Sequence, residues 1–130
     1  MQKIYISGGA YLMKDFPEFM KNHENHIDSS QQSRPEIDGY FYEGASGGQM
    51  AFWTYPTTSS STKHTHEFDE YVVCVHGQYT AFLNDEKVNL LPGDELFIPS
   101  GTEHWEERIA GTRTIHAFGG KRIVRKQSDK

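Results

Sequence analysis

Cysteine is almost absent from this sequence, since Cys74 is the only one among 130 residues. No disulfide can therefore form within the chain, which fits a reducing compartment. Apolar runs are also short: none approaches the length of a membrane span, and the N-terminus has no apolar signal core. We therefore expect a cytoplasmic protein without a membrane partner.

Positive charge is scarce as well. The chain has 13 Lys and Arg against 18 Asp and Glu, a formal net charge of −5, and its basic residues gather only in the last ten positions. This balance argues against a surface that binds nucleic acid. We expect residues 121–130 to form a polar, basic, solvated tail rather than a binding arm.

Glycine and residues that favour strands are plentiful by contrast. Twelve glycines indicate many tight turns. Eight short segments after residue 39 are rich in β-branched or aromatic residues and bounded by turn residues: 40–43, 50–55, 71–75, 78–83, 87–91, 95–98, 105–109 and 113–118. Asn84-Asp85 predicts a two-residue hairpin turn between two of them. The series predicts an all-β sandwich, jelly roll or small barrel.

The first 38 residues differ from this pattern. Residues 3–6 predict a short strand. Asp15, Pro17 and Glu18 then stand at the cap, first-turn and capping-box positions of a helix, and apolar residues recur at helical spacing as far as Ile27. A short N-terminal helix is therefore expected, followed by a polar loop over residues 28–38.

Two histidines one residue apart, followed by a carboxylate, mark the central stretch of the chain. Residues i and i+2 of a strand project to one face, about 7 Å apart along the chain, so His64 and His66 should point the same way. Glu70 lies on that side if the strand resumes after a bend. Imidazole and carboxylate together suit first-row metals, so we expect a metal site. The alternative is that all three are surface polar residues.

The spacing of these residues resembles the two motifs of the cupin superfamily. The first motif is His-x-His, three residues, Glu, six residues and Gly; the second is Gly, five residues, Pro, one residue, Gly, two residues and His. The matching residues are His64, His66, Glu70 and Gly77, then Gly93, Pro99, Gly101 and His104. Fifteen residues separate the two motifs, which is typical of small single-domain members.

The resemblance implies a double-stranded β-helix, or jelly roll, with a metal inside one end. Its ligands would be His64, His66, Glu70 and His104, with His104 brought across the cavity by a strand of the opposite sheet. The implied cofactor is a divalent transition metal (Fe, Mn, Ni or Zn), with positions open to water or substrate. Family members often pair through their sheets, so a homodimer is expected.

Two positions depart from the usual motifs. Thr58 stands where the first motif opens with Gly, and Arg108 stands where the second often ends with Asn. Neither is a metal ligand in the family. An inward Arg108 would favour an anionic substrate group. The alternative is a surface ion pair with Glu106 or Glu107.

His116, on the last predicted strand, is a second catalytic candidate, as an acid–base partner. The alternative is a packed core histidine. The ligand set does not choose a reaction, since one fold supports many chemistries. We therefore expect a metal-dependent enzyme that acts on a small oxygen-rich metabolite, of oxygenase, isomerase or lyase type. The alternative is a non-catalytic module that binds a sugar or an organic acid.

The length of the chain is that of one domain. We divide it into an N-terminal extension with a short strand and helix (1–38), a cupin β-barrel (39–120) and the basic tail (121–130).

Overall fold

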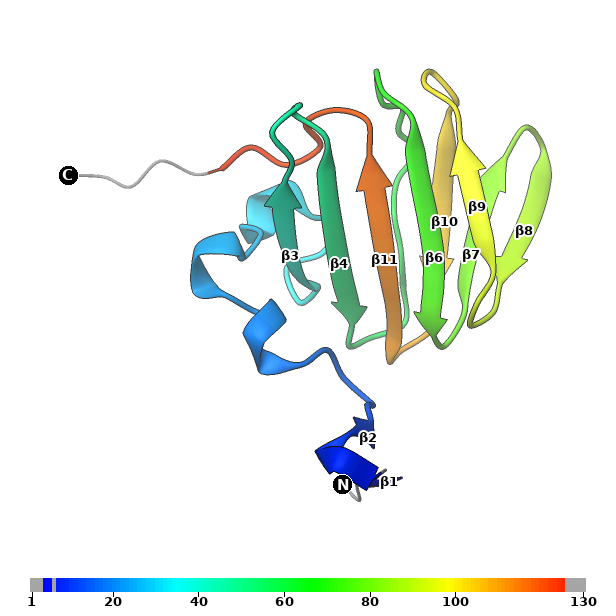
Figure 1. Cartoon of the computed structure of the whole chain (residues 1–130). Coiled ribbons are helices and arrows are strands. Elements are labelled where there is room, and N and C mark those ends of the chain that lie inside the picture. The colour runs from blue at the N-terminus through cyan, green and yellow to red at the C-terminus, as the bar shows by residue number, and fades with distance from the viewer. Residues whose placement is uncertain (1–3, 6, 126–130) are drawn as a thin grey trace.

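Two antiparallel sheets face each other and make up most of the protein (Figure 1). The computed structural model describes residues 4–5 and 7–125. The larger sheet has the order β3-β4-β11-β6-β9, formed by Asp38–Glu43, Gln49–Tyr55, Thr112–Phe118, Glu70–His76 and Glu95–Ile98. The smaller has the order β5-β10-β7-β8, formed by Ser59–Ser60, His104–Arg108, Tyr79–Leu83 and Glu86–Leu90. The predicted all-β jelly roll is confirmed.

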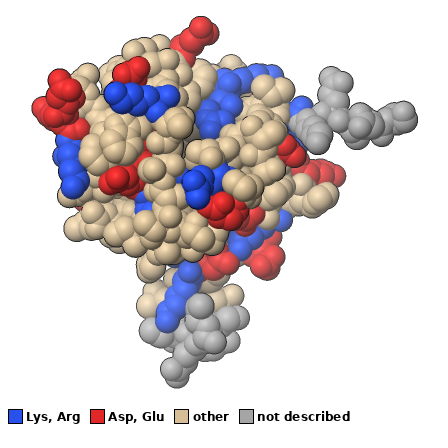
Figure 2. Space-filling view, turned by 180° about the vertical axis from the view of Figure 1, so that it is seen from behind, with Lys and Arg blue, Asp and Glu red and all other residues tan. Residues whose placement is uncertain are grey.

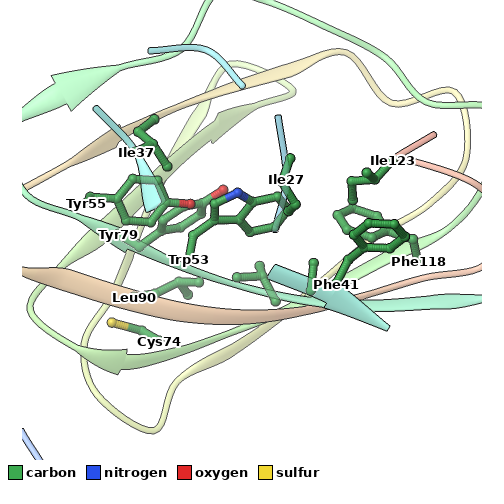
Figure 3. Packing of buried hydrophobic residues seen from close by; sticks show 12 residues of the cluster. Ile27, Ile37, Phe41, Trp53, Tyr55, Cys74, Tyr79, Leu90, Phe118 and Ile123 are labelled. Carbon is green, nitrogen blue, oxygen red and sulfur yellow. The ribbon is translucent and has the colours of Figure 1, made fainter. Parts of the chain in front are cut away.

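Alternation of buried and exposed residues sets the inner faces of the sheets. In β6, for example, Glu70, Val72 and Cys74 are buried while their neighbours are half-buried. Apolar side chains of both sheets meet in one cluster between them, which includes Trp53, Tyr55, Tyr79, Leu90 and Phe118 (Figure 3). Each large apolar side chain buried in this way contributes roughly 1.5–3 kcal/mol.

The turns follow the sequence closely. Asn84 and Asp85 both adopt positive φ, 50° and 60°, in the tight turn that joins β7 to β8, as a two-residue hairpin requires. Gly77 has a φ of 82°, and a Cβ at this position would lie only 2.4 Å from Thr112 Oγ1. This glycine lets β6 end tightly against the start of β11.

The predicted N-terminal helix is wrong. Instead of one α-helix, residues 18–31 hold three single 3₁₀ turns, Glu18–Met20 (η2), His23–Asn25 (η3) and Ser29–Gln31 (η4). The apolar residues of the supposed helix face separate into different layers: Phe16 packs on Phe52, while Ile27 joins the cluster between the sheets. One straight helix could not serve both positions, so tertiary packing overrides local propensity.

Both flanking segments return to the barrel. Ile27 and Ile37 come from the N-terminal side and Ile123 from the C-terminal side, and all three are part of the central cluster. Ile123 is 1% exposed, so the expectation of a solvated tail is wrong at this position. Residues 126–130 lie outside the described part. The division at residues 38 and 120 stays a prediction.

The N-terminal strand is described only at β1 (Ile4–Tyr5), which pairs with β2 (Tyr11–Leu12); residues 3 and 6 lie outside the described part. A further short 3₁₀ turn, Ser7–Gly9 (η1), joins the two strands. Across the described residues, no helix has the length and apolar character that crossing a membrane demands. Acidic and basic side chains are interspersed over the face seen in Figure 2.

Candidate metal centre and its cavity

The first and last predicted ligands lie side by side on one sheet. The backbone N–H of His64 donates to the carbonyl of His104 at 2.9 Å, and the N–H of His104 donates back to His64, also at 2.9 Å. The centroids of the two rings are 4.2 Å apart. The expectation that His104 reaches His64 from the opposite sheet is therefore wrong, because the two are direct antiparallel neighbours.

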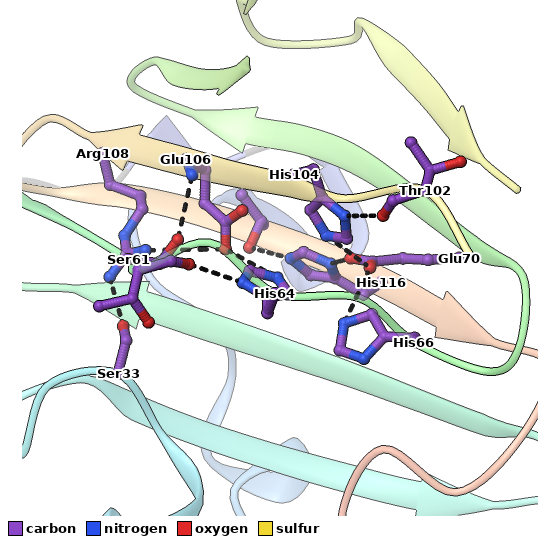
Figure 4. A network of polar contacts seen from close by, with 12 residues as sticks. Ser33, Ser61, His64, His66, Glu70, Thr102, His104, Glu106, Arg108 and His116 are labelled. Atoms are coloured by element: carbon purple, nitrogen blue, oxygen red, sulfur yellow. Dashed lines mark hydrogen bonds and ion pairs between the residues drawn. The ribbon is translucent and has the colours of Figure 1, made fainter. Parts of the chain in front are cut away.

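Glu70 is the residue that comes from the opposite sheet. It begins β6, and its Oε1 lies 3.5 Å from Nε2 of both His66 and His104 (Figure 4). Ligand atoms of His64, His66 and His104 all lie within 4.8 Å of one another. The structure thus brings together all four side chains that the motifs predict, from β6, β10 and the loop between β5 and β6.

Backbone carbonyls fix the tautomer of two of these rings. Nδ1 of His64 lies 2.9 Å from the Thr62 carbonyl, and Nδ1 of His104 lies 2.9 Å from the Thr102 carbonyl. A carbonyl only accepts, so each Nδ1 carries the proton and donates it. The Nε2 lone pair of each ring is then free to bind a metal, as in other histidine sites whose second nitrogen is held by a carbonyl.

A divalent ion fits this group of donors. Glu70 Oε1 is buried without a hydrogen-bond partner, although leaving a buried carboxylate oxygen unpaired is costly. Two ligands about 2.1 Å from a shared ion lie roughly 3.0–3.4 Å apart, close to the 3.5 Å that separates Glu70 Oε1 from Nε2 of both His66 and His104. Imidazole nitrogens with one carboxylate are the donors that divalent transition metals accept. The group could therefore hold one such ion.

Burial and neighbouring charges shift the pKa values of the predicted ligands. Burial lowers the pKa of His66 to about 4, which leaves this ring neutral near pH 7. Burial would raise the pKa of Glu70, but the imidazoles of His104 and His116 outweigh it and hold this pKa well below its usual range. Burial likewise opposes protonation of His104, yet Glu70 and the Thr102 carbonyl raise its pKa above the usual value. A metal must therefore displace a proton from His104 in mildly acidic solution.

His116 supports the carboxylate from behind. Its Nδ1 lies 3.0 Å from Glu70 Oε2, and its Nε2 lies 2.9 Å from the hydroxyl of Thr114. All three residues are buried. Because the Oε2 bond anchors one oxygen, the other oxygen of Glu70 is turned toward His66 and His104. Both ring nitrogens of His116 are thus engaged with the protein.

Arg108 does face inward, as its spacing from His104 suggests. The residue is 2% exposed, its Nη2 donates to Ser33 Oγ at 2.8 Å, and its guanidinium carbon lies 4.7 Å from the centre of the Tyr55 ring. Nη1 is 3.8 Å from Glu106 Oε1, which is also 3.8 Å from Nε2 of His64 (Figure 4). Glu106 therefore stands between the histidine group and Arg108.

These side chains line a cavity of about 400 Å³. The barrel contributes one part, the barrel wall, which includes Trp53, Tyr55, Tyr79 and Glu106. The flanks contribute another, which we call the flanking wall: residues 30–33 and Arg122. Sequence reasoning missed this second wall. Its residues follow no motif, and only the packing of the two flanks on the barrel brings them to the cavity.

Solved structures with the same architecture are many, and they are distant in sequence. An RmlC-like cupin from Shewanella frigidimarina is 15% identical, with 82% of this chain and 93% of that chain covered and a TM-score of 0.63. KdgF from a Halomonas species is 23% identical, with coverage of 72% and 92% and a TM-score of 0.61. A DMSP lyase structure is 18% identical, with coverage of 73% and 54% and a TM-score of 0.59.

At these identities the solved structures support the fold assignment alone. No curated protein matches the sequence. The family model described as a cupin domain matches residues 51–122, more than half of the chain, and this segment contains both histidine motifs. The chain belongs to the cupin family.

Proposed function

We propose that this protein is a metal-dependent enzyme that acts on a small, oxygen-rich, anionic metabolite, in a reaction of the oxygenase, isomerase or lyase type. The observation that carries the proposal is the buried Oε1 of Glu70, which has no hydrogen-bond partner and lies 3.5 Å from two histidines at the edge of an open cavity. His64, His66, Glu70 and His104 would hold the ion. When bound, a divalent ion of this kind polarises a carbonyl or similar oxygen as a Lewis acid.

The charges around the cavity favour an anionic ligand. Two carboxylates, Glu70 and Glu106, and two guanidinium groups, Arg108 and Arg122, line it, so these charges cancel. A bound divalent ion would then give the cavity a net charge of +2. Low-dielectric surroundings strengthen the attraction for an anion, so a metabolite with a carboxylate is preferred over a neutral one.

Arg108 and His116, the two catalytic candidates, take different roles in this proposal. Arg108 contributes positive charge at the inner end of the cavity, where Ser33 orients its guanidinium. His116 acts as a positioning residue, because both its nitrogens already bond to Glu70 and Thr114. Glu106 is better placed than His116 to exchange a proton with a ligand, since its carboxylate lines the cavity beside His64.

The test begins with the metal. We expect about one metal equivalent per chain in the purified protein by elemental analysis, and a lower melting temperature after chelation. An ion that binds only the folded state at about 100 times its Kd adds roughly 2.7 kcal/mol of stability. His66→Ala should lose the ion and the chelator response, whereas His76→Ala, an exposed histidine outside the cavity, should keep both.

A metabolite screen of the loaded protein follows. Turnover that disappears in His66→Ala would support the proposal of an enzyme. Arg108→Ala should weaken the binding of anionic ligands more than the binding of neutral ones. Tight binding without product after long incubation would instead indicate the non-catalytic binding module. An unchanged melting curve after chelation, with no metal in the protein, would contradict both.

The remaining predictions are a homodimer, a cytoplasmic location and no nucleic-acid partner. Light scattering coupled to gel filtration would test the dimer. We expect twice the 14.9 kDa mass of one chain.

A further inference from the structure

Arg122 is the one part of the flanking wall that carries a charge, and it lies where the sequence suggested a solvated tail. Its side chain is half-buried and lines the same cavity as His64, His66 and Glu70. The guanidinium carbon lies 5.9 Å from the centre of the Trp53 ring, and that ring also meets His116 edge-on at 4.8 Å. Arg122, from the flanking wall, and His116, which supports Glu70, thus pack against the same Trp53 ring.

The backbone beside Arg122 is held firmly, although it is not part of a strand. Gln49, which is buried, accepts from the N–H of Ile123 at 2.9 Å and donates to its carbonyl at 2.8 Å. Gln31 holds Val124 in the same two-way manner, at 2.7 and 2.8 Å. Side-chain amides replace a neighbouring strand for these two residues, so the segment presents Arg122 to the cavity in a fixed position.

The charge of Arg122 has no counterpart in the described residues, where it makes no ion pair or hydrogen bond. Its basic neighbours differ in this respect: Lys121 pairs with Glu43, and Arg125 donates to Asn25. A half-buried guanidinium that faces a cavity and has no carboxylate of its own to pair with can bind a ligand's carboxylate through two parallel hydrogen bonds.

We propose that Arg122 binds the carboxylate of the ligand, so that the cavity selects small organic acids that reach from the histidine group to Arg122. This inference rests on the proposed function, since the other end of the acid must offer oxygen atoms to the metal. Arg108 is less suited to this task because Ser33 and Glu106 already engage its guanidinium. Arg122 therefore binds the carboxylate itself and determines specificity for acids, while Arg108 adds positive charge to the cavity.

Calorimetric titration of the manganese-loaded protein tests the proposal with defined probes. Malonate, succinate and glutarate are each compared with the half-amide in which one carboxylate is replaced by a neutral amide. We expect at least one diacid to bind roughly tenfold more tightly than its half-amide, as one charge-assisted contact implies. Arg122→Gln should remove this preference, and Arg122→Lys should retain part of it.

Lys121→Gln is the matched control, because it removes the same charge one residue away and outside the cavity, and it should keep the preference. A wild-type protein that binds none of the probes or shows no preference, or an Arg122→Gln variant that keeps the preference, would overturn the assignment. Manganese content is measured before and after each titration. Protein that never takes up manganese contradicts the proposed function; loaded protein without the preference contradicts only the role of Arg122.

Discussion

The two walls of the cavity are built in opposite ways. The barrel wall is made largely of strands, and an isolated antiparallel backbone bridge aligns His64, in the loop between β5 and β6, with His104 of β10. The flanking wall is held by side-chain amides that bond to distant backbone, such as Gln31 to Val124 across 93 positions of sequence. The metal donors therefore lie on the barrel strands and on the loop that pairs with them, and the residue we assign to ligand choice lies on the appended part.

This difference suggests that the two properties can vary separately. Changes in the barrel wall should affect folding and metal binding together, because the same strands serve both. Changes in the flanking wall should alter ligand preference while the metal stays bound. Three substitutions test how far this separation holds.

Gly77→Ala should have the largest effect. The new methyl group would lie 2.4 Å from Thr112 Oγ1 and 2.8 Å from Thr112 Cα, on a backbone with φ of 82°. We expect a loss of more than about 3 kcal/mol in the free energy of unfolding, from steric overlap added to left-handed strain. Chemical denaturation measures this loss.

Gly101→Ala is the control for backbone strain alone. Gly101 has nearly the same φ, 83°, but a Cβ there would meet nothing within 4 Å. The Gly101→Ala variant should lose about 1 kcal/mol in the free energy of unfolding. Equal losses in the two variants would show that the contact with Thr112 relaxes freely, so that β6 and β11 do not need the close approach that Gly77 allows.

His116→Ala should have the next largest effect. Without the bond to Oε2, Glu70 can turn its free oxygen away from His66 and His104. Metal affinity should fall about 10- to 100-fold, as is typical when the partner of a metal ligand is removed. Competition with a fluorescent chelator measures it, with His26→Ala, an exposed histidine paired with Asp38, as the control. An unaltered affinity would remove His116 from its positioning role.

Gln31→Ala should have the smallest effect. It deletes two hydrogen bonds to Val124 at the surface, worth about 1 kcal/mol of stability together. Metal affinity should stay the same, while the preference for diacids should weaken because Arg122 loses its fixed backbone. If metal affinity falls along with the preference, the two walls are coupled and the comparison fails.

Local signals in the sequence predicted most of the barrel. Alternation and turn residues placed eight strands and the Asn84-Asp85 hairpin, because each of these patterns acts within a few residues. The sequence did not predict β5, because its serines are typical of a loop. They form a strand only because Glu107 and Arg108 pair with them. The prediction of an N-terminal helix was wrong for a related reason, because Phe16 and Ile27 pack on residues that are distant in the sequence.

The candidate site shows the same limit. Motif spacing predicted four donors, and the structure gathers all four, although whether they bind a metal stays a prediction. The inward direction of Arg108 followed from its parity with His104. The partners of His116 and the place of Arg122 could not be predicted, because they depend on the strand pairing and on contacts between the two ends of the chain.

The two carbonyl-held imidazoles have a practical consequence for how an ion would enter. Since the Thr62 and Thr102 carbonyls already fix both rings, uptake requires no rearrangement of the main chain. Crystals grown in chelator should therefore tolerate soaking with manganese and diffract as before, with anomalous density rising at the histidines. The speed of uptake should depend on passage through the cavity mouth rather than on a slow change of shape.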